Sequence, residues 1–168
     1  MQKPIVSILM GSDHDLPVMK EAGEVLASFD IPFEYAVTSA HRSPQRTADI
    51  ARTAEERGIK VMIVGAGMAA HLAGSVAAWT VLPVLGVPID ATLGGLDALL
   101  STAQMPPGVP VGTMGIGKAG ARNAGILAVQ ILALSDPGLT KRLRRYKETM
   151  AREVEGKDRG LQDSSRTE

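Results

Sequence analysis

The stretch from residue 61 to residue 89 constrains the fold most, because it contains no Asp, Glu, Lys or Arg. Its length raises the question of a membrane helix, which needs about 20 consecutive apolar residues. Glycine and proline interrupt the stretch repeatedly, and His71 lies within it. The pattern therefore favours a buried strand, a helix and a second buried strand over one membrane span. It also indicates burial at a subunit interface.

Apolar runs of strand length alternate with helical patterns along the chain. Strands are predicted at 5–10, 32–38, 60–64, 83–87 and 111–116, and helices at 17–29, 44–57, 69–80, 94–104 and 121–134. By the right-handed crossover rule, this order predicts an α/β fold, a three-layer α/β/α sandwich with a central parallel sheet. Residues 1–155 are predicted to form a single α/β catalytic domain, and 156–168 a flexible charged tail.

Two helices near the C-terminus are predicted to need a partner. The helix at 121–134 is apolar all round, and a helix of this kind must be buried on all sides. A terminal helix begins at Asp136-Pro137, a residue pair typical of an N-cap and a first helical position. Its apolar face also needs a surface to cover, and the face consists of Leu139, Leu143, Tyr146 and Met150.

Composition excludes several classes of function. The 168 residues include 18 basic and 18 acidic side chains, so the electrostatic footprint of a nucleic-acid-binding protein is missing. There is no cysteine, which excludes disulfides, thiolate metal sites and a cysteine nucleophile. The first residues lead into a short strand-like run and lack the apolar length of a signal peptide. We therefore expect a cytoplasmic protein with a small ligand and no membrane segment.

Polar or glycine-rich loops follow each of the first three predicted strands, at 11–15, 39–44 and 65–71. Because parallel strands end at the same edge of a sheet, these loops are expected to meet in one crevice. The side chains expected there are Ser12, Asp15, Ser39, His41, Arg42, Gly67 and His71.

The second loop carries the strongest chemical signal. Ser43 and Pro44 are typical of an N-cap and a first helical position, so His41 and Arg42 lie at a strand-to-helix corner. An imidazole beside a guanidinium at a helix N-terminus indicates proton transfer on a phosphorylated substrate. A capped helix with two solvated polar side chains explains the hexapeptide equally well, and both interpretations stay open at this point.

The other loops are less specific. In the first loop, Ser12 and backbone N–H groups are candidates to hold a phosphate, and Asp15 either caps a helix or accepts from ribose hydroxyls. The loop is neither a Walker loop nor a dinucleotide-binding turn. In the third loop, small residues let the backbone approach a flat ligand, while a lone histidine such as His71 in an apolar helix is more often structural.

With these loops assembled, residues 4–150 resemble the class I N5-carboxyaminoimidazole ribonucleotide mutases of purine biosynthesis. The similarity lies in several ordered motifs, so chance is a poor explanation. The three loop motifs are Gly-Ser-Asp-His-Asp-Leu-Pro at 11–17, Ser-Ala-His-Arg-Ser-Pro at 39–44 and Gly-Ala-Gly-Met-Ala-Ala-His-Leu at 65–72. Further matches are Leu-Pro-Val-Leu-Gly-Val-Pro at 82–88, Gln-Met-Pro at 104–106 and Lys-Ala-Gly-Ala-Arg-Asn-Ala at 118–124.

The resemblance implies a flavodoxin-like fold, a homo-octamer with the nucleotide bound between subunits, a C-terminal helix packed on a neighbouring subunit, and no metal or organic cofactor. It implies that His41 transfers the proton. It assigns the ribose and phosphate to Ser12, Asp15, Ser39 and Arg42, and a backbone wall near the transferred carboxylate to Ala66 and Gly67. His71 and Leu72 match family positions at the substrate.

The implied reaction moves a carboxylate from the exocyclic N5 of the nucleotide to C4 of its imidazole ring. The route we expect is loss of CO2, its retention in a closed pocket, attack by C4 and removal of the C4 proton. A single histidine is sufficient for both proton transfers, because imidazole gains and loses a proton near neutral pH. Retention of CO2 requires a tight, dry pocket, for which Ala66, Gly67 and Ala70 are suitable walls.

Three residues depart from the usual family pattern. His14 stands where serine is common, and we expect it to be an exposed loop residue. Met68 stands where a second glycine is common, and we expect its side chain to point into the core. Ala73 stands where proline is common. None of these departures removes a residue with an assigned chemical role.

Two other functions are weighed against the mutase. A class II relative carboxylates aminoimidazole ribonucleotide directly with CO2, but members of that class usually carry lysine after the histidine of the second loop and lack the Ala-Ala-His of the third. Arg42 and His71 therefore argue against class II. The other alternative is a non-catalytic module that binds a nucleotide phosphate on a flavodoxin-like sheet, without turnover.

Overall fold

The computed structural model describes residues 3–165. These residues form two compact units, one ending at Ile131 and the other beginning at Leu132. The first unit contains a parallel sheet of five strands in the order β2-β1-β3-β4-β5. This confirms the predicted parallel sheet. The strands are β1 (Val6–Met10), β2 (Phe33–Val37), β3 (Val61–Gly67), β4 (Val84–Ile89) and β5 (Gly112–Thr113).

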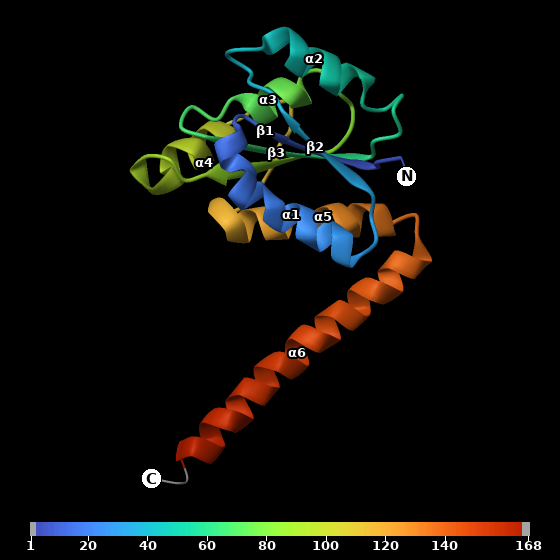
Figure 1. The fold of residues 1–168 in the computed structure, drawn as a ribbon, viewed down its shortest axis with the longest axis vertical. Helices are drawn as coiled ribbons and strands as arrows, with labels where there is room; N and C mark the ends of the chain where they lie inside the picture. Colours follow the sequence, from blue (N-terminus) through green and yellow to red (C-terminus); the bar gives the residue numbers. More distant parts are fainter. Residues whose placement is uncertain (1–2, 166–168) are drawn as a thin grey trace. The chain divides into compact units, whose positions relative to one another are not determined.

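Helices cover both faces of this sheet, so the predicted three-layer α/β/α sandwich is confirmed. Figure 1 shows α1 and α5 against one face and α2, α3 and α4 against the other. The helices are α1 (Leu16–Ser28), α2 (Pro44–Thr53), α3 (Leu72–Ala77), α4 (Leu96–Ala103) and α5 (Gly117–Ala133). Two short 3-10 helices, η1 (Asp13–Asp15) and η2 (Leu93–Gly95), precede α1 and α4.

The charge-free stretch 61–89 forms β3, α3 and β4, as its pattern predicts. All residues of β1 and β4 are buried, because these strands are covered on both faces. Successive side chains point to opposite faces, so Leu9 and Met62 join the core beneath α2 and α3 while their neighbours face the other layer. Within residues 3–165, no helix combines the length and the apolar character needed to cross a bilayer.

Helices α1 and α5 pack closely, as expected for a core with few aromatic side chains. A Cβ atom added at Gly125 of α5 would lie 2.9 Å from the carbonyl oxygen of Ala22 and 2.9 Å from Cβ of Val25 in α1. Glycine is therefore required where α5 crosses α1. Only 3% of the residues are aromatic, and small side chains let these layers approach one another.

Two elements are shorter than the sequence predicts. The helix expected at 69–80 is α3 (Leu72–Ala77). It starts late because Met68 has a φ angle of 55°, which is incompatible with a right-handed helix and places a turn first. The strand expected at 111–116 is reduced to β5, which lies at the edge of the sheet and pairs only with β4.

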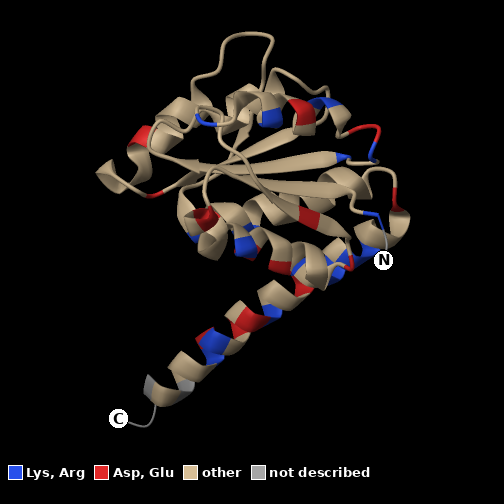
Figure 2. Cartoon of the chain, turned by 45° about the horizontal axis from the view of Figure 1, so that its top comes forward, with Lys and Arg blue, Asp and Glu red and all other residues tan. Residues whose placement is uncertain are grey.

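The second unit is dominated by the long helix α6 (Pro137–Ser165). Basic and acidic side chains alternate along it (Figure 2), and most of its residues are exposed. The helix continues past Gly156, where the sequence predicts a tail, because the residues on both sides of Gly156 are good helix formers. Residues 166–168 of that tail lie outside the described residues. The division after Ile131 falls inside the range 1–155, so the single domain over that range remains a prediction.

Asp136 caps α6, as its sequence pattern predicts. Its Oδ1 accepts from the backbone N–H groups of Gly138 at 2.8 Å and Leu139 at 3.1 Å. We expect Asp136→Ala to destabilise the first turn of α6 by about 1 kcal/mol. Hydrogen exchange of the first-turn amides should then be faster by about fivefold. Asp136→Asn keeps an acceptor and should exchange like the wild type, whereas equal exchange in all three proteins would contradict the capping role.

Candidate active site

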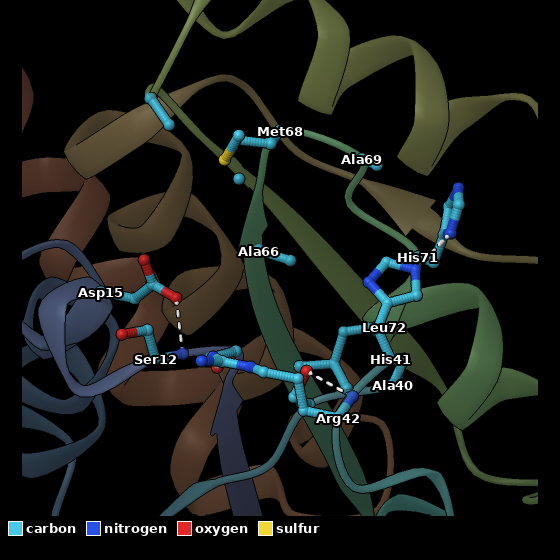
Figure 3. Close-up of a pocket in the computed structure, with 14 residues that line it drawn as sticks. Ser12, Asp15, Ala40, His41, Arg42, Ala66, Met68, Ala69, His71 and Leu72 are labelled. Carbon is cyan, nitrogen blue, oxygen red and sulfur yellow. Dashed lines mark hydrogen bonds between the residues drawn. The ribbon is translucent and has the colours of Figure 1, made fainter.

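A pocket of about 410 Å³ opens at the carboxyl edge of the sheet, where the chain leaves β1 and β3 in opposite directions. In open α/β sheets this reversal of strand order is where ligands bind. The loops after β1, β2 and β3 all contribute to the pocket (Figure 3). The residues predicted for the site line this pocket, with the exception of Ala70: Ser12, Asp15, Ser39, His41, Arg42, Ala66, Gly67, His71 and Leu72.

The first loop is held by Ser12 and Asp15. The backbone N–H of Ser12 donates to Asp15 Oδ2 at 3.0 Å, and the Ser12 hydroxyl accepts from the N–H of His14. The Asp15 side chain thus stabilises the 3-10 turn η1. It makes no hydrogen bond to the first N–H groups of α1, so the first of its two predicted roles, capping of that helix, is wrong. The Ser12 N–H is paired with Asp15, and the Ser12 hydroxyl contacts Asp13 and His14, so a ligand would have to compete for this hydroxyl.

Partial burial raises the pKa of Asp15, although the Ser12 N–H opposes this effect. The folded protein therefore holds a proton on Asp15 at a pH where the unfolded chain has lost it. The ionised carboxylate lowers the stability of the fold, and acidification through the raised pKa relieves that cost. Such a carboxyl, in a pocket beside histidine and arginine, is a marker of a functional site.

This shift gives a measurable pH dependence. Asp15→Asn removes the titrating group, so its free energy of unfolding should exceed that of the wild type most at neutral pH. The difference should shrink as pH falls through the Asp15 pKa, which burial raises above the ordinary value for an aspartate. Urea unfolding of both proteins across this pH range measures the difference. A difference that stays constant with pH would show that Asp15 is not shifted upward.

The second loop is a turn closed on itself by Ser39 and Ser43. The Ser39 N–H donates to Ser43 Oγ at 3.0 Å, and the Ser43 N–H donates to the Ser39 carbonyl oxygen at 2.8 Å. Ser43 occupies the N-cap position of α2 but makes no side-chain cap, so its predicted capping bond is absent. The Ser43 hydroxyl instead accepts from the Ser39 N–H within the turn. The turn places His41 and Arg42 at the edge of the sheet.

Arg42 connects the second loop to the first. Its side-chain Nη2 donates to the carbonyl oxygen of Gly11 at 3.2 Å, and its backbone N–H donates to Ser39 Oγ at 3.2 Å. The guanidinium has further N–H groups and its residue is exposed, so it remains able to bind an anion in the pocket. Arg42 is the cation that lines this pocket in the described chain.

The most informative contact joins two histidines from different loops. His41 Nε2 lies 2.8 Å from His71 Nδ1, with the ring centroids 4.9 Å apart and the planes inclined by 75°. One nitrogen must donate and the other accept, so the pair holds a proton between the rings. His71 is therefore not the core histidine that its apolar surroundings suggest. It is exposed at the start of α3 and orients His41 in the pocket.

The third loop forms an apolar wall. A Cβ atom at Gly67 would lie 3.1 Å from the carbonyl oxygen of Ile89 and 3.3 Å from Cβ of Ala91, so only glycine fits there without a shift. Ala69 lines the pocket in place of Ala70, which is buried and donates its N–H to Ser101 Oγ. The wall role expected for Ala70 is therefore wrong.

The structure shows where the side chains of Met68 and His14 point. Met68 lines the pocket and is 57% exposed, so the expectation that it points into the core is wrong. Its positive φ directs the side chain outward. His14 is an exposed loop residue as predicted, with 92% of its side chain accessible, and it contacts Asp13. Sequence reasoning also missed Ala91, whose position after β4 at the same edge was the available signal.

Together these groups suit acid–base chemistry on an anionic ligand. A cation, a carboxylate, an imidazole pair and two serines line a cavity whose other wall is apolar. Among the described residues, no three histidine, aspartate or glutamate side chains are grouped as a metal site.

A sequence profile described as AIR carboxylase matches residues 5–153, which is most of the chain. The chain belongs to the AIR carboxylase family. It is 53% identical over 163 residues to the N5-carboxyaminoimidazole ribonucleotide mutase of Pyrococcus horikoshii, covering 96% of this chain and 91% of that relative. It is 55% identical over 152 residues to the enzyme of the same name from Thermotoga maritima, covering 90% and 88%.

Solved structures share this fold. The crystal structure of Treponema denticola PurE matches with a TM-score of 0.85 and 26% identity, covering 94% of this chain and 98% of that chain. The family resemblance inferred from the loop motifs is therefore confirmed. The roles of single residues in the pocket do not follow from these comparisons and rest on the geometry above.

Proposed function

We propose that this protein is an N5-carboxyaminoimidazole ribonucleotide mutase of de novo purine (IMP) biosynthesis, an isomerase. The product is 4-carboxy-5-aminoimidazole ribonucleotide. The observation that carries the proposal is the 2.8 Å contact between His41 and His71, made in a pocket that also contains Arg42 and an apolar wall. The names of the relatives support the choice of substrate.

Binding of the nucleotide is assigned to the polar side of the pocket. Arg42 anchors the phosphate, because its planar guanidinium offers several N–H donors to phosphate oxygens. Asp15 accepts from ribose hydroxyls, and the hydroxyls of Ser12 and Ser39 complete the polar contacts. Leu72 is buried and supplies apolar wall beneath the base. No metal or organic cofactor is needed for this binding scheme.

Proton transfer is assigned to His41. The bond between N5 and the carboxylate carbon breaks, N5 takes a proton from His41, and CO2 is formed. C4 of the ring then attacks CO2, a carbon–carbon bond forms, and the C4 proton returns to His41. The proton balance is zero over the cycle, so one histidine is sufficient. His71 holds Nε2 of His41, which leaves Nδ1 of His41 to face the substrate.

The apolar wall has a separate task in this scheme. CO2 carries no charge and no hydrogen-bond donor, so the pocket retains it by shape and by exclusion of water. The small residues Ala66 and Gly67 let the substrate carboxylate approach the backbone closely. The positive side of the pocket at Arg42 holds the nucleotide in place while CO2 moves between its two positions.

A two-substrate assay tests the proposal. Purified protein is given N5-carboxyaminoimidazole ribonucleotide in one reaction, and aminoimidazole ribonucleotide at ordinary CO2 levels in another. We expect rapid product formation only from the carboxylated nucleotide. Turnover of aminoimidazole ribonucleotide alone would identify a class II carboxylase that uses CO2 directly. Tight nucleotide binding without turnover of either compound would identify a binding module.

Assembly and location belong to the same proposal. We propose a cytoplasmic homo-octamer in which α6 packs on a neighbouring subunit. Support comes from apolar side chains that the single chain leaves exposed, including Leu134 at 89%, Val154 at 67% and Leu161 at 70%. A light-scattering mass near the value of 17.6 kDa for one chain would contradict the octamer.

A further inference from the structure

Met68 has a backbone conformation that glycine adopts far more readily. Among the described residues, the non-glycine residues with positive φ are Asp30, Met68 and Leu93. Met68 has a φ of 55°, in the left-handed region where the Cβ atom crowds the following carbonyl oxygen. The local backbone therefore gives no reason to prefer methionine over glycine at this position.

The left-handed turn is imposed from outside the loop. Ser101 Oγ of α4 accepts from the N–H of Ala70 at 3.1 Å and lies 3.4 Å from the carbonyl oxygen of Met68. The single proton of this hydroxyl is donated within α4, to the carbonyl oxygen of Asp97 at 2.6 Å. The turn at residues 68–70 is thus tied to α4 through backbone contacts that do not involve the side chain of Met68.

Core packing does not explain the methionine either. The residue is 57% exposed, although methionine is usually buried, and it belongs to the lining of the pocket. Figure 3 shows its side chain at the end of β3, beside the wall that contains Ala66, with the thioether directed away from His71. The side chain therefore adds apolar surface to the open part of the pocket, and to little else in the single chain.

We propose that Met68 is a positioning residue that covers the apolar side of the pocket and keeps CO2 from escaping during carboxylate transfer. This inference rests on the proposed mutase function. An unbranched thioether adapts its shape to a ligand, so it can close over the wall at Gly67 after the nucleotide has entered. Methionine at a strained position is then explained by its effect on the bound intermediate.

The expected defect follows from the bonds involved. If CO2 leaves the pocket after the N5–carbon bond breaks, N5 keeps the proton received from His41 and aminoimidazole ribonucleotide is released. His41 then regains a proton from water. The uncoupled products are aminoimidazole ribonucleotide and CO2, and any later carboxylation draws carbon from the surrounding bicarbonate pool.

The test uses N5-carboxyaminoimidazole ribonucleotide with a 13C carboxylate, in buffer containing unlabelled bicarbonate. Mass spectrometry measures the fraction of label in the product, and released aminoimidazole ribonucleotide is measured after subtraction of decay without protein. The variants are Met68→Gly, Met68→Ala and Met68→Leu. Leu93→Gly is the matched control, since Leu93 has a φ of 48° and is 79% exposed but does not line the pocket.

We expect wild type, Met68→Leu and Leu93→Gly to retain the label. Met68→Gly and Met68→Ala should lose label and release aminoimidazole ribonucleotide about tenfold faster, the scale for loss of a few methylene contacts in a pocket. The thermal midpoint of Met68→Gly should be no lower than that of the wild type.

Three results would overturn the inference: full label retention in Met68→Gly, equal label loss in Leu93→Gly, or a changed light-scattering mass in Met68→Gly, which would place the side chain at a subunit contact. Wild-type protein that forms no labelled product would reject the mutase function itself, a result distinguishable from these three.

Discussion

Replacement of His41 by asparagine is expected to lower kcat by about 10³-fold, within the range for removal of a general acid–base group. Asparagine keeps a polar side chain at the corner but cannot carry a proton through the reaction. Because His41 is exposed and makes its contact at the surface of the pocket, thermal unfolding of the variant should match the wild type. Steady-state kinetics with N5-carboxyaminoimidazole ribonucleotide measures the loss.

Two other histidines serve as comparisons. His14→Asn changes an exposed residue outside the pocket lining and should leave kcat unchanged. His71→Asn keeps a hydrogen-bonding group beside His41 but loses the paired imidazole, so we expect a smaller decrease, of about 10- to 100-fold. Activity of His41→Asn equal to the wild type would remove His41 from the mechanism.

Gly120→Ala is expected to destabilise the fold by about 3 kcal/mol, although alanine is the better helix former by about 1 kcal/mol. Gly120 is buried in the first turns of α5, and an added Cβ would overlap the carbonyl group of Gly115. The overlapping atoms are backbone, so the chain itself must move. Urea unfolding at fixed protein concentration should show a lower midpoint with a similar slope.

Gly156→Ala is the matched control for this substitution. Gly156 lies within α6, and a Cβ there would meet nothing within 4 Å. Because the added Cβ meets no other atom, only helix propensity changes the stability. Alanine at this position should therefore stabilise α6 by about 0.5 to 1 kcal/mol. If Gly120→Ala were as stable as the wild type, the close approach of the two backbone segments would be wrong.

The sheet and the position of the pocket were predictable because they follow from strong and redundant signals. Each central strand is a continuous apolar run followed by small or polar residues, and parallel strands bring those residues to one edge. The ordered loop motifs supplied the expected reaction class, and residues 5–153 match the AIR carboxylase family.

Side-chain details were less predictable because they depend on contacts between segments far apart in sequence. The pairing of His41 with His71 joins residues 30 positions apart. The turn that contains Met68 is tied to Ser101 in α4 through the N–H of Ala70, and no pattern around residue 68 contains that information. Ser43 has the sequence of an N-cap, yet its hydroxyl bonds to Ser39 instead. The Ser43 oxygen can accept either from the first N–H groups of α2 or from the Ser39 N–H, and local sequence preferences do not distinguish these two bonds.

The strand order has a consequence for how mutations away from the pocket affect activity. The two histidines come from loops after β2 and β3, and β1 lies between these strands. Met10 at the end of β1 is level with Val37 on one side and Gly65 on the other. A slip of one residue would move a loop by about 3.3 Å, more than the imidazole contact tolerates. The buried strand β1 thus sets the spacing between the loops that carry the proton-transfer pair, and changes in its register should impair turnover before they unfold the protein.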